Sequence, residues 1–61
     1  MKKYTILSGN GEYHGEFLGT DFKDAVINFK NTIPDWGIRN NIDINNLTYY
    51  GQKFYGNEIE E

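Results

Sequence analysis

The sequence contains no cysteine, and it has a single histidine and a single proline among its 61 residues. Without cysteine the chain has no disulfide, and His14 cannot assemble a zinc site by itself. Small domains often depend on such cross-links, because a chain of this length buries only roughly 60% of the surface that it exposes when unfolded. Stability must therefore come from packing alone or from a partner, and we expect neither a metal nor any other cofactor.

Long hydrophobic runs are missing as well. The apolar stretch from Tyr4 to Leu7 is far too short for a signal-peptide core or a membrane span. The absence of cysteine fits a reducing compartment. We therefore expect a cytoplasmic protein that does not contact membranes.

Basic residues are scarce. The chain has six Lys and Arg against nine Asp and Glu, which gives a net charge of −3 at pH 7. Binding to nucleic acid relies on clustered basic side chains that displace counterions from phosphates, so this charge argues against a nucleic-acid partner. The one dense acidic run is Glu58, Glu60 and Glu61, and we interpret residues 57–61 as a solvated, frayed tail.

A strong turn signal lies near the N-terminus. Asn10-Gly11 separates two strand-like segments, and Asn-Gly is typical of a two-residue type I′ turn. We expect a hairpin over residues 3–18 in which Leu7 faces His14, so that both lie on the outer face of the sheet. The same register gives an apolar inner face of four side chains: Tyr4, Ile6, Tyr13 and Phe17.

A helix is predicted over residues 20–32. Thr20 is the expected N-cap, and Pro34 ends the helix because it disfavours helical geometry at the residue before it. One helical face is apolar and would cover the inner face of the hairpin. This stripe consists of Phe22, Ala25, Val26, Phe29 and Ile33.

Residues 33–46 are predicted to be irregular, with one short helical turn, because turn-forming Asp and Asn alternate with apolar anchors. Trp36 lies in this segment. The favoured interpretation is a lid over the C-terminal end of the helix. The alternative is an exposed anchor for a partner, since Trp and Tyr are enriched at binding hot spots.

The segment 47–56 has two interpretations. If Gly51-Gln52 forms a type II′ turn, it is a second hairpin that presents Tyr50 and Tyr55 on the outer face. If Gly51 is a bulge, it is one continuous strand. We therefore expect one α+β domain over residues 1–61: an antiparallel sheet of three or four strands with one amphipathic helix packed on one face, in the order ββαβ or ββαββ.

No catalytic constellation is evident. Nucleophilic catalysis requires a nucleophile beside an oriented base, and His14 would have only Ser8, Thr5 and Glu16 near it on the hairpin. A histidine and a glutamate two positions apart on an exposed strand are routine. We therefore predict no catalytic residue, and a protein that is not an enzyme.

The outer sheet face is the predicted partner-binding surface. Aromatic and aliphatic side chains within a polar rim are typical of a protein interface. The simpler interpretation is that they only stabilise cross-strand pairs. The expected partner-binding residues are Tyr50, Tyr55, Leu7, His14, Leu18 and Trp36.

The closing segment, LTYYGQKFY at residues 47–55, and the bias toward Asn, Ile, Lys and Tyr carry a resemblance. In style and size the chain resembles short orphan proteins encoded by phages and mobile elements, some of which inhibit host defence as anti-CRISPR or anti-restriction proteins. A ββαββ order is also similar in topology to the small immunoglobulin-binding domains of streptococcal protein G. The first resemblance implies an inhibitor that occludes a surface of a larger host protein. The alternatives are a single-stranded nucleic-acid-binding or regulatory module, and a structural homodimer.

Overall fold

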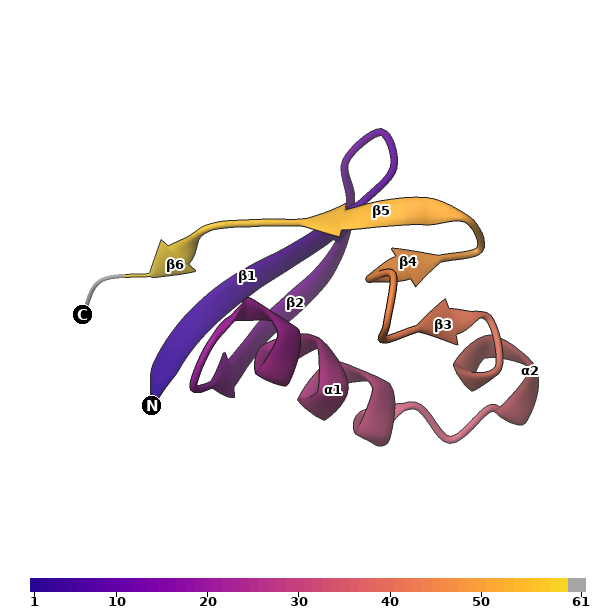
Figure 1. Ribbon diagram of the computed structural model, residues 1–61, viewed down its shortest axis with the longest axis horizontal. Coiled ribbons are helices and arrows are strands. Elements are labelled where there is room, and N and C mark those ends of the chain that lie inside the picture. Colours follow the sequence, from indigo (N-terminus) through magenta and orange to yellow (C-terminus); the bar gives the residue numbers. More distant parts are fainter. Residues whose placement is uncertain (60–61) are drawn as a thin grey trace.

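The computed structural model describes residues 1–59, in which a curled antiparallel sheet wraps around one side of the main helix (Figure 1). The helix α1 lies across the inner face of the first hairpin, and the short helix α2 lies at the far end of the molecule from the two termini. The elements, in chain order, are β1 (Lys2–Ser8), β2 (Glu12–Gly19), α1 (Phe22–Thr32), α2 (Trp36–Arg39), β3 (Ile42–Asp43), β4 (Thr48–Tyr49), β5 (Gln52–Tyr55) and β6 (Glu58–Ile59).

The strands follow the order β2-β1-β5-β4-β3, and β6 pairs with β1 beyond the end of β5. This confirms an α+β fold with an antiparallel sheet and one main helix. The prediction of three or four strands is wrong, because the sheet of the described residues has six. The two unexpected strands, β3 and β6, are two residues long. Strands this short have no alternation of apolar and polar residues from which to predict them.

The segment predicted as a frayed tail is ordered over Glu58–Ile59. Glu58 pairs with Tyr4 of β1, and its carboxylate lies 3.3 Å from Nζ of Lys2. The backbone pairing holds this segment against β1, whereas an exposed ion pair of this kind contributes little. The remainder of the predicted tail, residues 60–61, lies outside the described residues.

The main helix begins at Phe22, two residues later than predicted, and its N-cap is Asp21 rather than Thr20. The side chain of Asp21 accepts a hydrogen bond from the backbone N–H of Asp24, at 2.8 Å. Asp24 in turn accepts one from the backbone N–H of Thr20, at 2.9 Å. A carboxylate caps more effectively than a hydroxyl here because it also interacts favourably with the helix dipole. The helix ends at Thr32, before the extended Ile33, as the following proline predicts.

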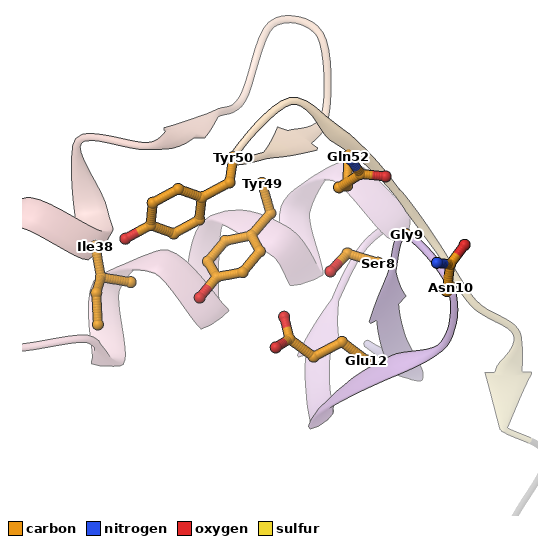
Figure 2. A pocket seen from close by; sticks show the side chains of 8 residues that line it. All are labelled: Ser8, Gly9, Asn10, Glu12, Ile38, Tyr49, Tyr50 and Gln52. Atoms are coloured by element: carbon orange, nitrogen blue, oxygen red, sulfur yellow. The ribbon is translucent and has the colours of Figure 1, made fainter.

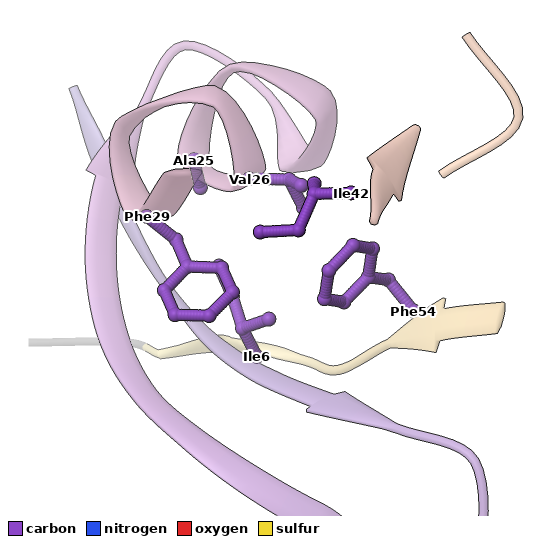
Figure 3. Packing of buried hydrophobic residues seen from close by; sticks show 6 residues of the cluster. All are labelled: Ile6, Ala25, Val26, Phe29, Ile42 and Phe54. Carbon is purple, nitrogen blue, oxygen red and sulfur yellow. The ribbon is translucent and has the colours of Figure 1, made fainter. Parts of the chain in front are cut away.

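The core lies between α1 and the inner face of the sheet (Figure 3). Ile42 and Phe54 approach the helix from the second half of the chain and close the core at the end that the first hairpin leaves open. Distant parts of the chain thus share one small core, so its apolar burial depends on the complete sheet. The buried hydrophobic residues are Ile6, Ala25, Val26, Phe29, Ile42 and Phe54.

The first hairpin contains a bulge that its sequence pattern did not predict. Pairing follows the expected register up to Ile6 opposite Gly15, and then shifts so that Leu7 lies opposite Tyr13. His14 is the extra residue, and Gly15 after it has a φ of 119°, which glycine adopts at little cost.

The bulge corrects two predictions about which side chains face the core. Side chains alternate between the faces of a strand, so one inserted residue reverses the orientation of those on its far side. His14 therefore points inward rather than outward, and Tyr13, predicted in the core, is 59% exposed. The turn also has three residues rather than two, because Ser8 pairs with Glu12.

The second hairpin is confirmed, but its turn is displaced by one residue. Tyr50 and Gly51 form the turn with positive φ values of 50° and 78°, the pattern of a type I′ turn, instead of Gly51-Gln52. Tyr49 accordingly pairs with Gln52. The backbone N–H of Tyr50 donates to the carbonyl of Asn41, at 3.0 Å. Tyr50 is thus a turn residue and not a member of the outer face.

The expected helical turn in residues 33–46 is present as α2, capped by the side chain of Asp35. Trp36, at its start, is 71% exposed, so the interpretation as a lid over the helix end is wrong. Its ring instead lies against the guanidinium of Arg39, whose Cζ is 5.7 Å from the ring centroid.

Replacing Gly56 with alanine should destabilise the fold severely. Gly56 connects β5 to β6 where the chain runs alongside β1, and a Cβ at this position would overlap the carbonyl oxygen of Thr5. We expect a loss of at least about 3 kcal/mol in the free energy of unfolding, measured by urea denaturation, or failure to fold.

The matched control is Gly51→Ala, where φ is also positive but no atom lies within 4 Å of the added Cβ. This variant should lose only about 1–2 kcal/mol from backbone strain. Equal losses for the two variants would show that Gly56 does not approach β1 as described.

Candidate functional site

Three strands place an aromatic row on the outer face of the sheet. Leu7 of β1 lies opposite Tyr13 of β2 on one side and opposite Tyr55 of β5 on the other. Directly opposed residues share a face, so these side chains are adjacent. Tyr13 is 59% and Tyr55 44% exposed, and Leu7 is half-buried between them. We call Tyr13, Leu7 and Tyr55 the tyrosine row.

The same face continues along β1 toward the termini. Thr5 lies opposite Glu16, and Lys3 lies between Leu18 on β2 and Ile59 on β6. Leu18 is 50% exposed. The outer face therefore has an aromatic end, a polar middle and a second apolar position, with charges of both signs beside them.

The structure brings together only part of the predicted partner-binding set. Leu7, Leu18 and Tyr55 lie on the outer face, whereas His14 points into the core and Tyr50 lies at the β4–β5 turn. Trp36 is exposed on α2, outside the sheet.

Tyr13 was missed as a candidate because the two-residue turn gave it the wrong orientation. The available signal was Gly15. A glycine within a strand often marks a bulge, and a bulge there places Tyr13 on the outer face.

His14 lies within a cluster of aromatic rings beneath the first turn. Its ring centroid is 4.8 Å from that of Tyr49, 5.0 Å from Phe29 and 5.8 Å from Phe54. Its Nε2 forms a hydrogen bond of 2.7 Å with Oγ of the buried Ser8. The side chain is 8% exposed, so the ring is effectively part of the core.

Burial lowers the pKa of His14 below its usual value of 6.5, and the nearby Glu12 carboxylate opposes this effect only in part. The neutral ring is therefore favoured in the folded state. Glu12 Oε2 lies 3.5 Å from the same Nε2 that meets Ser8. In a hydrolytic triad the acid and the nucleophile contact different nitrogens of the imidazole. The arrangement of Ser8, His14 and Glu12 does not match that geometry.

A pocket of about 510 Å³ opens where the β1–β2 turn meets the β4–β5 turn (Figure 2). The rings of Tyr49 and Tyr50 form one wall, with centroids 4.7 Å apart and an interplanar angle of 86°. The Glu12 side chain lies across from them, and Ile38 of α2 closes one side. The remaining lining residues are Ser8, Gly9, Asn10 and Gln52.

Within residues 1–59, no group of three or more His, Asp or Glu side chains is placed to hold a metal ion, and no helix is long and apolar enough to cross a membrane. Comparisons with protein-family models, curated proteins and solved structures found no match to this chain.

Protonation of His14 should destabilise the fold. Because burial lowers its pKa in the folded state, the unfolded chain takes up the proton first as the pH falls. The free energy of unfolding should therefore decrease as the pH falls below about 6.5, in proportion to the protons that the unfolded state binds in excess.

Urea denaturation at a series of pH values from 7.5 to 5 measures how the free energy of unfolding depends on pH. The His14→Gln variant should remove this dependence. An NMR titration of the His14 ring should give a midpoint below 6.5, the ordinary value for histidine. A midpoint at or above that value would contradict the burial of the ring.

Proposed function

We propose that this chain is a protein-binding module whose outer sheet face, centred on the tyrosine row, docks on a larger host protein. The observation that carries this proposal is the row itself, in which Leu7 lies between the exposed Tyr13 and Tyr55 on adjacent strands. Exposed apolar clusters within a polar rim are characteristic of interaction surfaces. Binding, rather than catalysis, is the role that this surface fits.

The chemistry of the row suits an interface. Tyrosine offers a large rigid ring with a hydroxyl at its end, so it can bury apolar area and still form a hydrogen bond. Thr5, Glu16 and Lys3 lie beside the row and would form the polar rim. Because β1 is paired on both sides, the row is held on a stiff backbone and loses little conformational entropy on binding.

Occlusion is the mechanism that we propose, as in the phage-encoded inhibitors that the sequence resembles. A domain of this size can cover part of a larger surface without performing chemistry on it. The net charge of −3 favours a target with a basic surface, because opposite charges accelerate association. We place this interaction in the cytoplasm.

Two exposed tyrosines on an open sheet also favour a second candidate, the stacking of single-stranded nucleic acid. Glu16 lies on the same face, and Glu12 beside the row, where each would repel phosphates. The salt dependence of binding separates the two candidates, because phosphate contacts make the affinity fall steeply as the salt concentration rises.

The test uses Tyr13→Ala combined with Tyr55→Ala, and Trp36→Ala as a control that removes an exposed ring away from the sheet. A partner captured from extracts of the cells in which the chain is made is purified and titrated by calorimetry. The double variant should bind about 30-fold or more weakly, and the control should bind as the wild type does.

Circular dichroism establishes that all variants are folded. Unchanged affinity of the folded double variant would exclude the tyrosine row as the binding surface. A captured nucleic acid with a steep salt dependence would favour the second candidate. A dimer in sedimentation experiments that the double variant abolishes would show that the face instead joins two copies of this chain.

A further inference from the structure

We propose that the pocket between the β1–β2 and β4–β5 turns binds a cationic group, either a guanidinium or an alkylammonium. The pocket lies in a different part of the molecule from the tyrosine row, and binding of a cation there does not depend on the row. The pocket is built from aromatic rings, a carboxylate and neutral hydrogen-bond acceptors (Figure 2). The cation could be a free small molecule or the side chain of an arginine or lysine, and the experiment separates these sources.

The aromatic wall provides the first argument. The rings of Tyr49 and Tyr50 stand almost perpendicular to each other, so they form a corner rather than a flat stack. The face of an aromatic ring is electron-rich and attracts cations, and perpendicular rings can contact one cation from two directions. Tyr50 is 51% exposed, which leaves its ring accessible to a ligand.

The charge of the lining provides the second argument. Among residues 1–59, Glu12 is the only ionised group that lines the pocket, and no Lys or Arg of these residues lines it. In the described part of the chain, the basic group within ion-pair distance of this carboxylate is His14. The pKa of His14 is lowered, so the neutral ring leaves the charge of Glu12 uncompensated.

The raised pKa of the Tyr49 hydroxyl shows the same negative electrostatic potential in the pocket. Burial raises its pKa first, and Glu12 and the hydroxyl of Tyr50 raise it further, so the three groups lie close enough to interact. A cation placed among them would meet one full negative charge and the oxygen atoms of two hydroxyls. An anion would be repelled, and a neutral ligand would lack the charge–charge attraction to Glu12.

The cations of the chain nearest in sequence to this region are engaged elsewhere. Arg39 follows Ile38 on α2, but its guanidinium lies against the ring of Trp36. Lys53 follows Gln52, and its Nζ donates to the carbonyl of Asn46, at 3.0 Å. Neither residue lines the pocket. The negative charge of Glu12 is thus left for a cationic ligand to neutralise.

The site is preformed rather than a gap between loose turns. The backbone N–H of Gly9 donates to the carbonyl of Lys53, at 3.2 Å, which ties the β1–β2 turn to β5. The N–H of Tyr50 donates to Asn41, and the ring of Tyr49 packs on the core. The volume of about 510 Å³ falls in the range of small-ligand sites. It is ample for one guanidinium or ammonium group.

Titration of the protein with N-acetyl-arginine amide, followed by ¹H–¹⁵N NMR spectra, tests this inference. The neutral isostere N-acetyl-citrulline amide is the matched ligand control. The arginine derivative should shift the resonances of Glu12, Tyr49, Tyr50 and Gln52, and the citrulline derivative should bind at least about fivefold more weakly. Equal shifts with the two ligands, or shifts centred elsewhere, would overturn the proposal.

Two variants locate the effect. Glu12→Gln should reduce affinity for the arginine derivative at least about fivefold and remove the preference over citrulline. Glu58→Gln makes the same change in charge on β6, outside the pocket, and it should leave affinity unchanged. Equal losses in the two variants would mean that only the net charge attracts the ligand, and would overturn the site.

The source of the cation is determined with two further ligands. A glycine-flanked arginine peptide that binds more tightly than N-acetyl-arginine amide indicates a protein side chain. If free agmatine binds more tightly than N-acetyl-arginine amide, the natural ligand is a small molecule. Both results support the site. Since neither titration involves the outer face, the outcome is independent of the test with Tyr13 and Tyr55 variants.

Discussion

The extra residue in β2 determines how the surfaces of this molecule are composed. With His14 inserted and Gly15 at positive φ, the strand keeps Ile6 opposite Gly15 but reverses the orientation of the side chains toward the turn. The histidine ring then enters the core beside Phe29 and Tyr49. The bulge is supported by this packing and by the hydrogen bond to Ser8, which satisfies a buried hydroxyl. Bulges of this kind re-aim side chains at a cost that local packing must offset.

Both candidate surfaces derive from that reversal. On the outer face of the sheet, the reversed orientation places Tyr13 beside Leu7, in one row with Tyr55. On the inside, His14 supports the ring of Tyr49, which walls the pocket opposite Glu12. Because the histidine is neutral, it fills space in the core without cancelling the charge of the carboxylate. One local irregularity thus supplies an exposed aromatic row on the outer face and supports a wall of the pocket between the turns.

Local patterns predicted the elements that depend on local physics. The helical stripe and Pro34 placed α1 to within two residues at each end, and the hairpin near Asn10-Gly11 is present. Two strands were not predictable: β3 and β6 are too short to carry a pattern, and the partner of β6, β1, is far away in sequence. The predicted length of the first turn was wrong for a different reason. Gly-Asn-Gly satisfies both a two-residue and a three-residue loop, and what separates them lies outside the turn: Gly15 within the strand and the packing of His14. The site prediction inherited this error at His14 and Tyr13.

The orientation of His14 is the most direct measure of this account. Nuclear Overhauser effects from its ring protons identify the neighbours without perturbing the molecule. The bulged register predicts strong effects to the rings of Phe29 and Tyr49, with Tyr13 showing effects to Leu7. Effects from His14 to Leu7, with Tyr13 contacting the core, would instead establish the two-residue turn and contradict both proposed surfaces.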